Sequence, residues 1–162
     1  MKLFFMLLVV AAVSLLQAQT STVEYVPGST VKISQLVGDY DRQQQAPTLN
    51  LTETRVGLES TDLGVPFQHN GRTFVLFGDT WGAPRGDAIA YTTDTDPHDG
   101  IELTFLTDTS GTYKPLEIPG ISQADFEVPM EGVSVDGSMY VYHTTDHSDR
   151  VMMGRSVVAV SR

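Results

Sequence analysis

The sequence comprises 162 residues without a cysteine, and its 20 acidic residues outnumber the 10 basic ones to give a formal net charge of −10. This charge argues against nucleic-acid binding, in which basic side chains that meet phosphates supply most of the affinity, and against docking on anionic membranes. It fits a neutral or cationic partner. The lack of cysteine excludes disulfide bonds and thiol chemistry.

Residues 1–18 have the features of a secretory signal peptide. Lys2 supplies the positive start, Leu3–Leu16 is almost wholly apolar, and Ala18 offers a small residue at a cleavage point. The apolar run is too short for a comfortable membrane span. We therefore expect a secreted or extracytoplasmic protein. The alternative is an uncleaved N-terminal anchor, which would also hold the domain outside the cytoplasm.

The segments that follow are predicted to be an arm and two strands. Residues 19–29 are polar and end near the turn-forming pair Pro27-Gly28, which predicts a flexible N-terminal arm. Thr30–Val37 alternates in the manner of a strand, and Thr48–Val56 does so as well.

A stretch of alternating residues opens the central part of the chain. Leu63, Val65 and Phe67 recur with a period of two, which places apolar side chains on one face of a strand. Asp62 is predicted to lie on the opposite face.

The remaining elements are predicted to be short strands and turns. Residues 69–71 (HNG) form a hairpin turn, because Asn and Gly tolerate positive φ angles. Strands are predicted over 72–78, 88–93 and 101–106, and 113–119 is extended because its prolines exclude helix. Beyond residue 18 no window has the 3.6-residue period of an amphipathic helix, so the fold class is predicted to be all-β.

An internal repeat with a period of about 65 residues indicates β-propeller blades, built from short strands and turns. The alternative is that any β-meander contains successive hairpins. A propeller needs typically four or more blades, and the sequence has room for about two. Residues 30–162 are therefore expected to be a truncated, N-terminal portion of a β-propeller domain. The repeat pairs Asp62–Pro66 with Asp125–Pro129, Asn70-Gly71 with Asp136-Gly137, and Phe74–Phe77 with Tyr140–His143.

Four motifs together resemble the domain of unknown function 4185 family over roughly residues 30–162. They are TDLG at 61–64, FGDT at 77–80, TTDTDP at 92–97 and FEVP at 126–129. The resemblance implies a five-bladed β-propeller. It also implies similarity to the endo-D-arabinofuranosidases of glycoside hydrolase family 183, which cut the D-arabinan of mycobacterial cell walls. Most members of the family have no assigned activity.

Three carboxylates are the candidate catalytic residues. Glycoside hydrolysis needs two carboxyl groups that flank the bond, one as acid and one as base or nucleophile. Asp62 lies on the predicted opening strand, Asp79 ends the next strand beside Gly78, and Glu127 lies on the equivalent opening strand of the second repeat. The sequence does not say which is the acid, and the alternative for each is a turn cap or a solvated strand end.

Asp87 and Trp81 are the candidate substrate-binding residues. Asp87 would support the catalytic carboxylates, and the indole of Trp81 could stack on the apolar face of a sugar ring. A core tryptophan at a blade edge is the alternative for Trp81. The sequence predicts no metal site and no cofactor, because no metal-binding or nucleotide-binding motif is present.

Taken together, these features predict an exported, glycoside hydrolase-like domain that acts on a furanose-rich polysaccharide such as D-arabinan. Its partner would be a polysaccharide or oligosaccharide. Because a fold does not imply a function, the alternative is a non-catalytic propeller that binds carbohydrate or mediates surface adhesion.

Overall fold

The computed structural model describes residues 23–147 and 154–161, so the predicted signal peptide at 1–18 lies outside the described residues. The chain divides into two units, Met1–Val31 and Lys32–Arg162. The described part of the first unit is exposed and contains one turn, at Pro27-Gly28. All of the described strands belong to the second unit.

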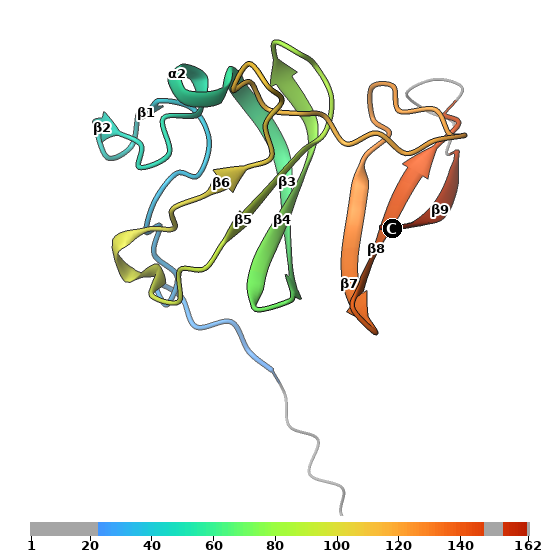
Figure 1. The fold of residues 1–162 in the computed structure, drawn as a ribbon. Helices are drawn as coiled ribbons and strands as arrows, with labels where there is room; N and C mark the ends of the chain where they lie inside the picture. Colours follow the sequence, from blue (N-terminus) through green and yellow to red (C-terminus); the bar gives the residue numbers. More distant parts are fainter. Residues whose placement is uncertain (1–22, 148–153, 162) are drawn as a thin grey trace, which may run out of the picture. The chain divides into compact units, whose positions relative to one another are not determined.

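Three antiparallel sheets make the second unit all-β, as predicted (Figure 1). The largest sheet has the strand order β3-β4-β5-β6, the second β7-β8-β9, and the smallest is the hairpin β1-β2. A propeller remains a prediction. The strands are β1 (Tyr40–Asp41), β2 (Ala46–Pro47), β3 (Leu58–His69), β4 (Arg72–Gly82), β5 (Ala88–Thr92), β6 (Thr104–Phe105), β7 (Pro129–Val135), β8 (Ser138–Thr145) and β9 (Arg155–Val160).

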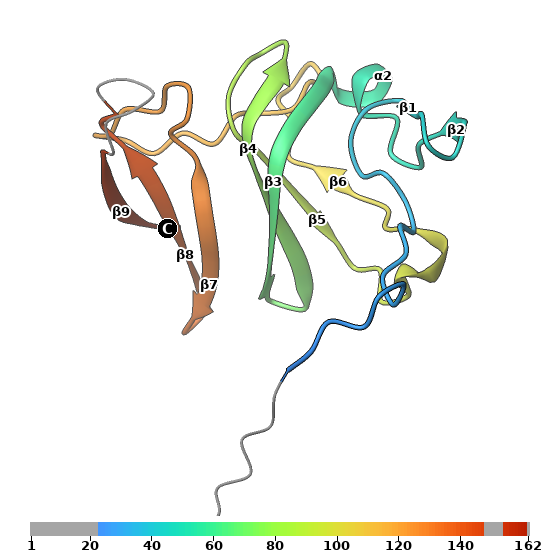
Figure 2. The ribbon, with the colours of Figure 1, turned by 180° about the vertical axis from the view of Figure 1, so that it is seen from behind.

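The four-stranded sheet is buried on both faces because β4 carries apolar residues on both. Phe77 and Val75 belong to one cluster, together with Leu58, Tyr113 and residues of β5 and β6. Phe74 and Leu76 alternate with these two residues along β4. They pack on the other face, with Phe67 of β3 and with side chains of β8. The two views in Figures 1 and 2 both show β7 beside this sheet.

Two of the predicted strands near the start of the unit are wrong. Residues 31–36 form no strand, and Thr48–Val56 contains the helix α2 (Thr52–Val56) in place of a strand. The carboxylate of Asp39 accepts hydrogen bonds from the backbone N–H groups of Glu53 and Thr54. These groups have no partner inside a helix, so a distant side chain stabilises the first turn.

Besides α2, the described chain contains the 3₁₀ turn η1 (Pro97–Asp99), which begins with the side chain of Asp96 accepting a hydrogen bond from the His98 N–H. Among the described residues, no helix is long and apolar enough to cross a membrane.

A β-bulge interrupts the predicted alternation in β3. The register between β3 and β4 shifts between Leu63 and Val65, and Leu63 has a φ angle of 62°. Its side chain is therefore 52% exposed, whereas Val65 and Phe67 pack into the core as predicted. A bulge adds one residue to one strand and redirects the side chains beside it. The prediction that all three apolar side chains share a face is wrong at Leu63.

The internal repeat is visible in the backbone. Each hairpin turns through two residues with positive φ, at 48° and 75° in the first repeat and 48° and 79° in the second. Positive φ angles also occur at Leu63 and Asp79 in the first repeat, and at Phe126 and Asp146 in the second. The two hairpin turns are at Asn70-Gly71 in the first repeat and Asp136-Gly137 in the second.

Gly132 of β7 allows the second sheet to approach the first. An added Cβ would overlap the Phe67 ring, with the ring Cγ 2.7 Å away. We expect Gly132→Ala to lower the free energy of unfolding by about 1–3 kcal/mol, the usual cost of overpacking a core. Urea denaturation checks this value. The control is Val135→Ala, an exposed position on the same strand, and an equal loss in both variants would contradict the explanation.

Candidate active site

A cleft of about 390 Å³ opens beside the ends of β3 and β4. It contains the candidate residues Asp62, Asp79 and Trp81, which the sequence separates by up to 19 positions. Asp125 and Arg85 also line it. The full lining is Ser60, Thr61, Asp62, Asp79, Trp81, Arg85, Asp125 and Phe126.

Asp79 is fixed from two sides. Its φ angle is 46°, a left-handed conformation that non-glycine residues seldom adopt and that often marks functional sites. Its backbone N–H donates to the Asp87 carboxylate at 3.1 Å, and its own carboxylate accepts the Phe126 N–H at 2.7 Å. The second bond links β4 to the segment that precedes β7.

Asp62 lies on β3 opposite Gly78, one residue before Asp79 on the neighbouring strand. The walls of the cleft remove part of its water, which raises the pKa of Asp62 above its usual value. The negative charges of Asp79 and Asp87 raise this pKa further. Asp62 therefore holds its proton to a higher pH than an isolated aspartate does.

Gly78 permits the close packing behind these two carboxylates. A Cβ at this position would lie 2.7 Å from Leu63 Cδ1 and 2.8 Å from Val128 Cβ. The space that a side chain would fill is thus occupied by side chains of both repeats. The close approach expected of this glycine is made by the protein itself.

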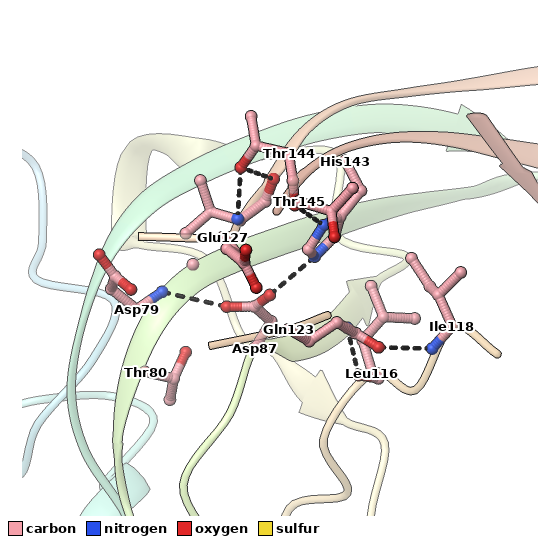
Figure 3. Close-up of polar contacts among 12 residues, drawn as sticks. Asp79, Thr80, Asp87, Leu116, Ile118, Gln123, Glu127, His143, Thr144 and Thr145 are labelled. Atoms are coloured by element: carbon pink, nitrogen blue, oxygen red, sulfur yellow. Dashed lines mark hydrogen bonds and ion pairs between the residues drawn. The ribbon is translucent and has the colours of Figure 1, made fainter. Parts of the chain in front are cut away.

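Asp87 does not line the cleft but lies behind it, in a buried ion pair with His143. Figure 3 shows its carboxylate between the Asp79 nitrogen and the His143 ring. Asp87 is 6% exposed, His143 is fully buried, and His143 Nε2 lies 3.0 Å from Asp87 Oδ2. The other ring nitrogen faces the Thr144 carbonyl at 2.5 Å. Both ring nitrogens therefore face oxygen atoms, and these two contacts fix the orientation of the imidazole.

Sequence reasoning missed His143, which lies on β8 and is 56 positions from Asp87. Its pairing with Asp87 depends on how the two sheets pack. The alternation of β8 offered the one usable signal, because it predicts a histidine on the buried face of a strand.

Glu127, which is labelled in Figure 3, is buried and does not belong to the cleft lining. Its two carboxylate oxygens accept the backbone N–H groups of Ala124 at 2.7 Å and of His147 at 2.9 Å. Burial acts to raise the pKa of Glu127, but these N–H groups and the Ser122 hydroxyl outweigh it and hold the pKa below its usual value. The arrangement fastens two loops together, and a catalytic role for Glu127 stays a prediction.

Asp125 is the acidic residue of the second repeat that lines the cleft, and it is the repeat counterpart of Asp62. The positive φ of the following residue, Phe126, accompanies a turn of the chain that separates Asp125 from the buried Glu127. Asp125 forms an ion pair with Arg85 at 2.9 Å.

Trp81 presents its indole to the cleft and is 53% exposed. The Arg85 guanidinium lies over the ring, 3.9 Å from its centroid. This cation–π contact and the ion pair to Asp125 hold Arg85 across the cleft. The alternative of a core tryptophan does not fit an indole that is half exposed.

Within residues 23–147 and 154–161, no group of three or more metal-ligating side chains is present. The cleft presents carboxylates, the hydroxyl groups of Ser60 and Thr61, one guanidinium and one indole. A family model described as a domain of unknown function (DUF4185) matches residues 48–149, a range that contains all five predicted site residues. A comparison with curated proteins gives no match.

Proposed function

The chain belongs to the DUF4185 family, and we propose that its cleft hydrolyses glycosidic bonds in a neutral, furanose-rich polysaccharide such as D-arabinan. The observation that carries this proposal is the pair Asp62 and Asp79 in one cleft, in unlike environments. Most glycosidases use two carboxyl groups in different surroundings, one as the acid and the other as the base or nucleophile.

Asp62 is the general acid in this proposal. Its raised pKa keeps a proton available, and the proton passes to the glycosidic oxygen as the bond from that oxygen to the anomeric carbon breaks. Asp79 acts on the other side of the bond. It either attacks the anomeric carbon, to be released later by water, or takes a proton from a water that attacks directly. Both routes consume one water for each bond cleaved.

The remaining residues of the cleft favour an uncharged sugar. Three aspartates and one arginine line the cleft, and that arginine is already paired with Asp125. A uronic acid or a sulfated sugar would meet net repulsion here. The exposed face of Trp81 offers the apolar surface on which a sugar ring stacks.

D-Arabinan as the substrate, and export as the route to it, are parts of the same proposal. The substrate follows from the likeness to endo-D-arabinofuranosidases that the motifs at 61–64 and 77–80 suggest. Export is proposed because Lys2 is followed by the apolar segment Leu3–Leu16, a combination that is typical of a secretory signal peptide.

The test is the release of reducing ends from D-arabinan by the purified protein, with an anionic polysaccharide such as polygalacturonate alongside. Wild type should cleave D-arabinan alone, and Asp79→Asn should reduce turnover by about 10²–10⁴-fold. The control is Asp99→Asn, an exposed aspartate on η1. If wild type releases no ends from any glycan yet binds D-arabinan, the enzyme proposal fails and the carbohydrate-binding alternative replaces it.

A further inference from the structure

We infer that His143 is a positioning residue for the proposed hydrolysis, because it holds Asp79 in its working geometry through the buried carboxylate of Asp87. This inference rests on the proposed function, in which Asp79 acts on the anomeric carbon or on the attacking water. His143 does not belong to the cleft lining. It acts from β8, so the second repeat sets the geometry of a residue on the first sheet.

Two polar contacts lead from His143 to Asp79. His143 Nε2 lies 3.0 Å from Asp87 Oδ2, and Asp87 Oδ1 accepts the Asp79 backbone N–H at 3.1 Å. Figure 3 shows the carboxylate between these two partners, with one oxygen on each. The orientation of the Asp87 carboxylate therefore depends on the His143 ring. Without the ring, Asp87 is free to turn away from the Asp79 N–H.

Asp79 needs this hydrogen bond because its backbone conformation is unfavourable. A φ angle of 46° at a residue other than glycine costs free energy and persists only where surrounding contacts hold it. The Asp87 side chain is only 6% exposed, so water has little access to take the place of His143. A displacement of about 1 Å in a catalytic group can lower a rate by about 10²-fold.

His143 is suited to this role because its own position is fixed. Its side chain is fully buried, and the second ring nitrogen, Nδ1, lies 2.5 Å from the Thr144 carbonyl oxygen. The residue lies on the middle strand of its sheet, in register with Pro129 of β7 and Val157 of β9. A buried ring on a strand that is paired on both sides has little freedom to move, which is what a supporting residue requires.

The neighbouring residue, Thr144, supports Asp79 by a second route. Its hydroxyl accepts the Val128 N–H at 2.8 Å, and its own N–H donates to the Val128 carbonyl at 3.0 Å. Val128 lies two residues after Phe126, whose N–H donates to the Asp79 carboxylate at 2.7 Å. The end of β8 thus supports both the backbone and the carboxylate of Asp79.

The first test is hydrogen exchange of the Asp79 amide, measured by NMR on the whole chain. His143→Phe should remove the protection of this amide. His143→Gln should restore it, because a glutamine amide offers Asp87 an N–H donor near the place of Nε2. The Leu76 amide, on the same strand between β3 and β5, reports any general loss of stability. The expected result is a loss of protection at Asp79 relative to Leu76.

The second test is the turnover of D-arabinan by the same variants. His143→Phe should lower kcat by up to about 10²-fold at an unchanged KM, because Trp81 and Asp62 still bind the glycan. His143→Gln should recover most of this loss, whereas a histidine that serves stability alone predicts no split between kcat and KM. The control is His98→Phe, at an exposed position on η1, which should keep the wild-type values.

A third variant covers the case in which His143→Phe does not fold. His143→Asn keeps an amide that can replace Nδ1 but is too short to replace Nε2. It is therefore a polar partner to His143→Gln and differs from it in reach alone. His143→Asn should lose the protection of the Asp79 amide and the turnover that His143→Gln keeps.

The outcomes separate this inference from the proposed hydrolysis. If exchange at Asp79 follows exchange at Leu76 in every variant, or if the glutamine variant loses as much turnover as the others, the positioning role is refuted even when wild type cleaves D-arabinan. If Asp79 alone loses protection and wild type cleaves no glycan, the proposed hydrolysis fails and the hold of His143 on Asp79 stands.

Discussion

Asp62→Asn is expected to lower the turnover of D-arabinan by about 10²–10⁴-fold without weakening the fold. The amide keeps the shape of the carboxyl group but has no proton to give to the leaving oxygen. Wild-type activity should decline as the pH rises through the pKa of Asp62. That pKa is raised, so the decline should begin at a higher pH than an ordinary aspartate would allow. Initial rates of reducing-end release across pH 3–9 measure both effects.

The same substitution should increase stability at neutral pH. A carboxyl whose pKa is raised by folding favours the folded state below its unfolded pKa, and this advantage is lost as the pH rises through the folded pKa. As the pH rises through this pKa, wild type gains an ionised Asp62 that the fold disfavours, and Asp62→Asn does not. Urea denaturation should give Asp62→Asn a higher free energy of unfolding than wild type at pH 7. The difference between the two proteins should be smaller at acidic pH. A variant less stable than wild type at pH 7 would disprove the electrostatic account.

His143→Phe is expected to lower the free energy of unfolding by about 1–3 kcal/mol, because it leaves the buried Asp87 carboxylate without the hydrogen-bond partner that His143 Nε2 provides. His98→Phe, at an exposed position on η1, is the matched control and should have little effect. Urea denaturation monitored by circular dichroism gives both values.

The double variant Asp87→Asn with His143→Phe separates the lost ion pair from a packing fault. The asparagine oxygen can still accept the Asp79 N–H, but no charge stays buried. Part of the stability lost in His143→Phe should therefore return. If the double variant is no more stable than His143→Phe, the cost lies in the fit of the phenyl ring and not in the unpaired charge.

Local sequence signals were sufficient for much of the fold. Asn70-Gly71 and Asp136-Gly137 each predicted a hairpin turn, and the Phe and Val residues of 72–78 predicted a strand, which the structure extends to Gly82 as β4. Such features depend on residues that are neighbours in the chain. The helix α2 was missed because its first turn is stabilised by Asp39, 13 or more positions earlier.

The candidate site was predictable where it depends on one hairpin and not where it depends on two sheets. Asp62 and Asp79 lie on adjacent strands of a hairpin, so their convergence followed from the turn between them. The partnership of Asp87 with His143, and the position of Asp125 rather than Glu127 in the cleft, arise from packing between the repeats. A single sequence contains no measure of that packing.

Trp81 is the only tryptophan of the sequence, and it lies in the cleft beneath the Arg85 guanidinium. The fluorescence emission of the protein above the tyrosine range therefore originates at one place. Its wavelength reports the hydration of the cleft, and quenching by acrylamide or iodide reports the accessibility of a single ring. Tryptophan fluorescence therefore reports on the cleft alone. A glycan that displaces Arg85 would change the emission of Trp81, so its binding could be followed without a label.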